Sequence, residues 1–210
     1  MNLLAHALIA GANPDHVIGS VMGDFVHGVL PTSLPPAVLD GVRLHRAVDS
    51  YTDSHPIIVN LRTQFQPPFR RFSGMLVDVW FDHLLSRDFT RWDARPLDAY
   101  CDQLHALFDT HAERLPADMW RFIRFMREYG LPAGYRERPA IGEVYQRMAR
   151  RFSRPTPLAQ AMPVMESLDQ PLEDAFNAFF PELTAFAADW LARQSKSAAP
   201  AEARETSANR

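Results

Sequence analysis

Apolar residues recur every three to four positions along most of the chain, and proline and glycine interrupt the repeats. Residues 3–8 show this spacing, which is typical of an amphipathic helix. The segment 75–89 is apolar almost all round, which predicts a buried central helix. Further helices are predicted over residues 15–28, 36–52, 57–65, 96–112, 116–129, 137–151, 157–167 and 171–193. Apolar and polar residues nowhere alternate with period two, so the sequence predicts an all-α, single-domain helical bundle.

The helical pattern ends near residue 193. Of the 210 residues, 1–193 are predicted to form one all-helical domain. Residues 194–210 lack bulky apolar side chains, so we expect a disordered C-terminal tail. The apolar N-terminus lacks the basic leader and cleavage site of a signal peptide, and no apolar run reaches the roughly 18 residues of a membrane helix. We therefore expect a cytoplasmic protein that does not associate with membranes.

Composition narrows the function classes further. A net charge of −3 excludes a globally basic nucleic-acid binder, although local basic patches remain compatible with it. The single cysteine, Cys101, allows no intramolecular disulfide and is interpreted as structural.

The predicted central helix carries two carboxylates among apolar residues. Asp78 and Asp82 are four residues apart, so they share one face of the helix. Burying carboxylates without partners costs several kcal/mol, and a divalent cation would offset that cost. The alternative is that they pair with arginines of other helices or face solvent.

The preceding segments add histidines and more carboxylates. His45 and Asp49 are again four residues apart, which lets both reach one metal or lets the carboxylate orient the imidazole. Asp24 follows a glycine within an apolar run, and His6 lies in a nearly all-apolar helix. Each has an ordinary structural explanation, such as a surface hydrogen bond or a core histidine. Together with His83 they favour a site inside the bundle, because the second half of the chain offers only His105 and His111.

Several of these segments resemble a known family. They are Met-Asn-Leu-Leu-Ala-His at 1–6, Gly23-Asp24-Phe25-Val26 followed by Gly28, the run from Gly41 to Asp53, and Asp78-Val-Trp-Phe-Asp82-His83-Leu-Leu-Ser86-Arg87. Over residues 1–90, and loosely to about 190, the chain resembles the acyl carrier protein phosphodiesterases, also called holo-acyl carrier protein hydrolases.

The resemblance implies a reaction and a cofactor. Family members cleave the phosphodiester link between a carrier-protein serine and its 4′-phosphopantetheine arm. They are described as dependent on a divalent metal ion, with Mn²⁺ expected first and Fe²⁺ or Mg²⁺ as alternatives, and as distant relatives of HD-domain phosphohydrolases, which implies an HD-domain-like fold. Here the pair reads Asp82-His83, the reverse of the usual order, so the HD ligand pattern is not transferred as such.

From the resemblance and the helix positions we assign roles. The expected metal ligands are Asp24, His45, Asp78 and Asp82. Asp49 is expected to orient a ligand or to bind as well, and His6 or His83 to protonate the leaving alkoxide. The expected catalytic residues are therefore His6, Asp24, Asp49 and His83.

The expected partner is acyl carrier protein, a small acidic protein, and no nucleic acid. Arginines would provide the complementary surface. The candidates are Arg46 as a phosphate clamp and Arg70, Arg71, Arg147, Arg150 and Arg151 as the docking surface. Two alternatives stay open: an HD-like phosphohydrolase acting on nucleotides or other small molecules, and a helical binding module whose carboxylates only cap and pair.

Overall fold

The computed structural model describes the backbone of residues 3–205 and the side-chain environments of residues 3–196. Helices make up the fold, and no β-strand occurs within residues 3–205. The α-helices are α1 (Leu3–Ile9), α2 (Pro14–Met22), α3 (Pro36–Ser54), α4 (Pro56–Thr63), α5 (Ser73–Arg87), α6 (Leu97–Thr110), α7 (Ala117–Glu128), α8 (Arg138–Arg150), α9 (Met162–Ser167) and α10 (Asp169–Glu205). Short 3₁₀ helices include η1 (Gly23–Phe25), η2 (Arg70–Phe72), η5 (Ala133–Arg136) and η6 (Pro157–Gln160). The all-α prediction is confirmed.

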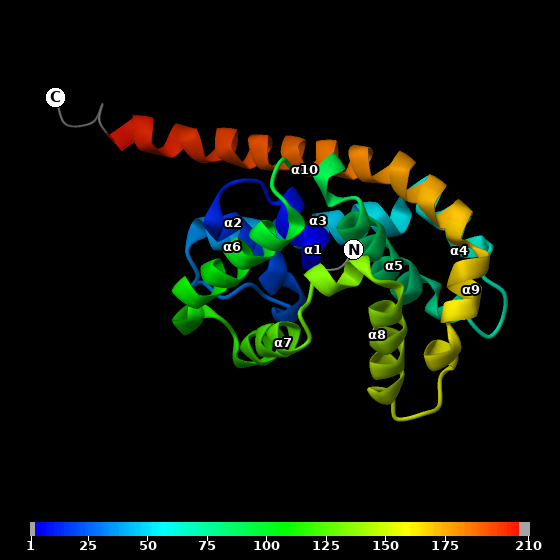
Figure 1. The fold of residues 1–210 in the computed structure, drawn as a ribbon. Coiled ribbons are helices and arrows are strands. Elements are labelled where there is room, and N and C mark those ends of the chain that lie inside the picture. Colours follow the sequence, from blue (N-terminus) through cyan, green and yellow to red (C-terminus); the bar gives the residue numbers. More distant parts are fainter. Residues whose placement is uncertain (1–2, 206–210) are drawn as a thin grey trace.

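Helix α5 is the centre of the bundle. Its side chains from Val79 to Ser86 are all buried, as the apolar pattern of 75–89 predicted. Helix α1 packs against it from one side, and α8 and η5 pack against it from another. Helix α10 runs across the bundle and contacts α1, α3, α4 and α5 (Figure 1). The short α1 is therefore surrounded by longer helices, and all of its side chains except Leu8 are buried.

Helices α2 and α3 approach each other more closely than ordinary side chains allow. A Cβ atom on Gly19 would lie 2.0 Å from the Val38 carbonyl oxygen, and one on Gly41 would lie 2.4 Å from the His16 carbonyl oxygen. Two facing glycines thus let the two backbones meet directly. This contact fixes the position of α3, which carries two residues of the site described below.

The helix boundaries follow the proline and glycine signals, with two differences. Helix α2 ends at Met22 and continues as η1, whereas the sequence predicted one helix to about residue 28. Helix α10 extends to Glu205, although residues 194–210 were predicted to be a disordered tail. Its final stretch is rich in Ala, Glu and Arg, which favour helix extension once a helix exists. The rest of the predicted tail, residues 206–210, lies outside the described residues.

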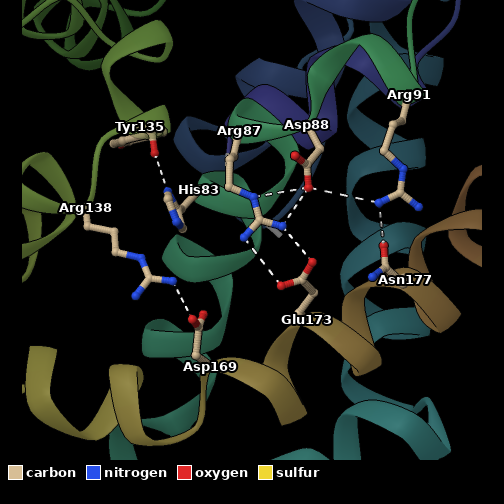
Figure 2. Close-up of polar contacts among 9 residues, drawn as sticks. All are labelled: His83, Arg87, Asp88, Arg91, Tyr135, Arg138, Asp169, Glu173 and Asn177. Atoms are coloured by element: carbon tan, nitrogen blue, oxygen red, sulfur yellow. Dashed lines mark hydrogen bonds and ion pairs between the residues drawn. The ribbon is translucent and has the colours of Figure 1, made fainter.

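Polar contacts connect α10 to α5 and to α8. Arg87 binds Asp88 and Glu173, the latter at 2.7 Å, and Arg138 pairs with Asp169 at the start of α10 (Figure 2).

Among the described residues, no helix has both the length and the apolar content that spanning a membrane requires.

Candidate active site

Two histidines from different helices stack in the interior of the bundle. The rings of His6 on α1 and His45 on α3 lie 4.0 Å apart between centroids, at an interplanar angle of 23°. Asp49, one turn after His45, bridges them. Its Oδ1 lies 3.2 Å from His6 Nε2 and its Oδ2 lies 3.1 Å from His45 Nε2. The i, i+4 spacing predicted from the sequence thus orients both α3 residues toward the same point.

Asp24 completes the group, which we call the His–Asp cluster (His6, Asp24, His45 and Asp49). Asp24 Oδ1 lies 3.4 Å from His45 Nε2, and Asp24 is more exposed than the other three residues. The neighbouring Gly23 explains this closeness, because a Cβ atom there would lie 2.2 Å from His45 Cγ. Glycine at position 23 therefore makes room for the His45 ring.

Backbone contacts fix the orientation of His45. Its Nδ1–H donates to the Ser20 carbonyl at 2.8 Å, which turns Nε2 toward the two carboxylates. The Ser20 hydroxyl in turn donates to the His6 carbonyl at 3.0 Å. Ser20 thus connects the two histidine-bearing segments through α2. Such outer contacts commonly set the tautomer of a metal-binding histidine.

The two histidines have opposite electrostatic environments. Burial lowers the pKa of His6 to about 4, despite the nearby Asp49 carboxylate. Burial also acts to lower the pKa of His45, but its contacts with Asp24 and Asp49 outweigh burial and raise that pKa to about 9. At neutral pH, His6 is therefore neutral and His45 carries a proton that a bound metal ion would have to displace.

The two carboxylates are held in their charged form. Burial acts to raise the pKa of each, but the contacts with His45, and for Asp49 also those with His6, leave both pKa values below their usual range. Two ionised carboxylates repel each other, and a cation placed between them and the neutral imidazole would interact favourably with all three groups.

The donor atoms fit a divalent metal ion. One donor atom each from His6, His45 and Asp49 lies within 4.8 Å of the others, the one such group found among the described residues. His6 Nδ1 is buried and lacks a hydrogen-bond partner among the described residues, and Nε2 faces Asp49 Oδ1. Mixed imidazole and carboxylate donors suit Mn²⁺, Fe²⁺ or Zn²⁺ more than Mg²⁺.

The expected ligands Asp78 and Asp82 lie elsewhere. Neither belongs to the group formed by His6, His45 and Asp49. Asp82 is fully buried, and its Oδ2 accepts from the Leu4 backbone N–H at 3.2 Å, so it caps the N-terminus of α1. The structure thus gives Asp82 a capping contact and places it outside the group that could hold a metal ion. Asp78, one turn earlier, lines a cavity together with Asp24.

The capping role of Asp82 predicts a pH effect on stability. Burial raises its pKa from 3.8 to about 7. A carboxyl that binds its proton more tightly in the folded chain makes folding less favourable as pH rises from the lower value to the higher one. Asp82→Asn is therefore expected to match the wild type near pH 4 and to exceed it in stability at pH 8. Urea unfolding of the metal-free proteins at both pH values tests this, and an unchanged difference between the two pH values would contradict it.

His83 also lies outside the His–Asp cluster. It is buried, and its Nδ1–H donates to the Tyr135 carbonyl at 2.7 Å, as Figure 2 shows. Burial lowers its pKa, and the nearby Arg138 and Arg87 add to that effect. A neutral, enclosed imidazole is poorly suited to protonating an alkoxide, and the contact that the structure shows for His83 is the hydrogen bond to η5.

Arg46 is engaged by the backbone. Its Nη2 donates to the carbonyls of Val26 and Gly28, both at 3.0 Å. It therefore holds the loop that follows Asp24, which differs from the phosphate clamp expected from the sequence.

The remaining arginines group together. Phe72 and Phe152 make an edge-to-face contact at 6.0 Å, which joins η2 to the end of α8. Arg70 and Arg71 directly precede Phe72, Arg150 and Arg151 directly precede Phe152, and all four arginines are exposed. We call these four residues the basic surface. Arg147 differs from these four because it is partly buried. Arg147 and Arg151 both line the same cavity as Asp24.

All four cluster residues are among the candidates named from the sequence, and the structure brings them together in a different grouping. His6 and Asp49 were expected to act in catalysis, and the structure places both beside His45 as potential ligands. The signal for His6 was its position in a helix whose other residues are nearly all apolar, which indicates that the helix and its histidine are buried. Ser20 and Gly23 were missed, because each acts through a backbone position that only the fold defines.

The fold and the cluster define an all-helical enzyme whose His and Asp donors meet beside a cavity. A family model described as acyl carrier protein phosphodiesterase matches residues 1–183. Proteins of that name from Yersinia pestis, Yersinia enterocolitica and Pectobacterium atrosepticum are 32%, 31% and 30% identical to this chain, over 87%, 90% and 87% of it and 95%, 98% and 95% of their own lengths. The chain therefore belongs to the acyl carrier protein phosphodiesterase family. No solved structure matches it significantly.

Proposed function

We propose that this protein is a metal-dependent phosphodiesterase that removes the 4′-phosphopantetheine arm from holo-acyl carrier protein. The products are apo-acyl carrier protein and free 4′-phosphopantetheine. The observation that carries the proposal is the convergence of His6, His45 and Asp49 donor atoms within 4.8 Å. The names of the relatives provide the substrate class.

The cluster residues would hold the metal ion. His6, His45 and Asp49 are the proposed ligands, and Asp24 is a further ligand or a proton acceptor at the open side. When bound, a divalent ion lowers the pKa of a coordinated water and polarises a phosphoryl oxygen. We favour Mn²⁺ or Fe²⁺ because two of the donors are imidazoles.

The protein side chains have distinct tasks in this proposal. His6 is neutral at working pH, because its pKa is about 4, so it can bind a cation but cannot supply a proton. Asp24 is ionised and is the most exposed of the four, so it is placed to accept a proton from the attacking water. The water gives one proton to Asp24 and its oxygen joins phosphorus. The bond from phosphorus to the serine oxygen breaks, and the serine oxygen takes up the proton that Asp24 had accepted, which returns Asp24 to its ionised form.

The basic surface would dock the carrier protein. Arg70, Arg71, Arg150 and Arg151 offer positive charge on a chain whose net charge is −3. Acyl carrier protein is acidic, so association should be steered electrostatically and should weaken as salt is added.

Removal of the metal ion provides the first test. We expect protein stripped by a chelator to leave holo-acyl carrier protein intact and expect added Mn²⁺ to restore its conversion to the apo form. The rate should rise at least about 100-fold, since the ion supplies both the nucleophile and charge stabilisation. Intact-protein mass spectrometry of the carrier protein measures the loss of the arm.

Three outcomes can be distinguished. Conversion that proceeds equally in excess chelator would refute the metal requirement. An intact carrier protein alongside metal-dependent cleavage of nucleotides would keep the metal centre and refute the substrate. Failure to bind Mn²⁺ at all, measured by calorimetry, would leave the cluster a structural feature.

A further inference from the structure

A cavity of about 240 Å³ lies beside the His–Asp cluster, among residues of α5, α7, η5 and α8. Asp24 joins the two features, because it lines the cavity and also lies 3.4 Å from His45 Nε2. Phe25, the next residue, contacts Phe122 of α7 at 5.6 Å between ring centroids. A larger cavity of about 670 Å³ exists near Trp92 and Tyr100, but it includes none of the cluster residues.

Most of the cavity wall is apolar. Met75 and Val79 come from α5, Phe122 and Phe125 from α7, and Val144 from α8. Walls of this kind suit methylene and methyl groups, and a few polar groups then set the orientation of the ligand. A bare phosphate group would gain nothing from such walls.

The charged groups of the cavity are of opposite sign and come from different elements. Asp24 and Asp78 contribute negative charge from η1 and α5, and Arg147 and Arg151 contribute positive charge from α8. Arg147 is held in place: its guanidinium carbon lies 3.6 Å from the centroid of Tyr129, and its Nη2 donates to Glu143 at 3.0 Å. A guanidinium fixed in this way is a preorganised donor for carbonyl oxygens.

The far wall is anchored through His83. Tyr135 lines the cavity, and its backbone carbonyl accepts the hydrogen bond from His83 Nδ1–H (Figure 2). This bond attaches η5 to the central helix α5. The helices that form the cavity are therefore held in place before a ligand binds. Such preorganisation favours binding of one specific ligand over nonspecific binding of apolar molecules.

We propose that this cavity binds the pantetheine portion of the arm and that Arg147 is a specificity-determining residue for it. The inference rests on the proposed function. Pantetheine is a narrow chain with a gem-dimethyl group, methylene groups and two amides. The aliphatic parts pack against Phe122 and Phe125, and an amide carbonyl accepts from Arg147. The phosphate end then lies at Asp24, where the cavity meets the cluster.

The first experiment blocks the cavity and requires no catalysis. Val144→Phe adds bulk to the cavity wall, and Val59→Phe makes the same change on α4, where Val59 is 49% exposed. Saturation-transfer NMR with free pantetheine is expected to show binding to the wild type and to Val59→Phe, and at least about tenfold weaker binding to Val144→Phe. Equal binding to all three proteins, or binding of a nucleoside monophosphate in place of pantetheine, would overturn the proposal.

The second experiment removes the polar contact. Arg147→Met keeps an apolar stem and deletes the donor, so the KM for holo-acyl carrier protein is expected to rise roughly tenfold with little change in kcat. Val59→Phe, which lies outside the cavity, is the control and is expected to keep the KM of the wild type. An unchanged KM would overturn the role of Arg147. If the wild type fails to cleave holo-acyl carrier protein, the proposed function fails, and pantetheine binding to the wild type and to Arg147→Met still decides the cavity.

Discussion

Gly19→Ala is expected to lower the free energy of unfolding by roughly 2–4 kcal/mol. The added Cβ would lie 2.0 Å from the Val38 carbonyl oxygen, and a backbone atom cannot turn aside as the end of a side chain can. Helices α2 and α3 must then separate. Alanine favours helix over glycine by about 1 kcal/mol, which is too little to offset the clash. Urea unfolding followed by circular dichroism measures the change.

Gly74→Ala is the matched control, because it makes the same chemical change in helix α5. A Cβ atom there would meet Arg62 Nη2 at 3.2 Å, the far end of a flexible side chain that can move. We expect its stability to remain close to that of the wild type. If both variants unfold at the same urea concentration, the close contact of α2 and α3 does not limit stability.

Asp49→Asn is expected to lower kcat/KM for holo-acyl carrier protein by a factor of about 100 to 1,000. Asp49 is the residue that contacts both histidines, at 3.2 and 3.1 Å. The amide is nearly isosteric but uncharged, and only its oxygen can accept or bind a cation. Mn²⁺ affinity should fall in parallel, and calorimetry measures it independently of any substrate.

Asp53→Asn controls for the loss of one carboxylate from α3. Asp53 is exposed and pairs with Arg62 at 2.8 Å, outside the cluster. Its turnover and Mn²⁺ affinity are expected to match those of the wild type. Full activity in Asp49→Asn, or an equal loss in both variants, would contradict the role assigned to the bridging carboxylate.

Most of the fold could be predicted from the sequence, because residues close to each helix end determine where that helix begins and ends. Pro36, Pro56 and the glycines interrupt the apolar repeat where the chain turns, and α3, α4 and α5 begin and end within two residues of their predicted limits. The extension of α10 to Glu205 was not predicted, because residues 194–205 lack the bulky apolar side chains that mark a buried helix face.

The site could be predicted only in part, because its residues come from different helices and the sequence does not show which helix faces pack together. His45 and Asp49 share one helix face, so their pairing followed from spacing. His6 comes from 39 positions earlier, and nothing local indicates that its ring stacks on His45. Asp78 and Asp82 share a face too, yet one lines the cavity and the other caps α1. An apolar helix does not specify the neighbour that each of its turns will contact.

The cluster and the cavity wall come from separate parts of the chain. The donors that would carry out the chemistry lie within the first 49 residues, whereas the walls contributed by α7, η5 and α8 begin more than 60 residues later. If the cavity binds the pantetheine portion as proposed, substitutions at Phe122 or Val144 should change the preference for the substrate and leave the His–Asp cluster unchanged. This separation makes the protein a favourable starting point for directed evolution. Libraries with substitutions only in α7 and α8 would test acceptance of new diesters, and every variant would keep the residues of the His–Asp cluster.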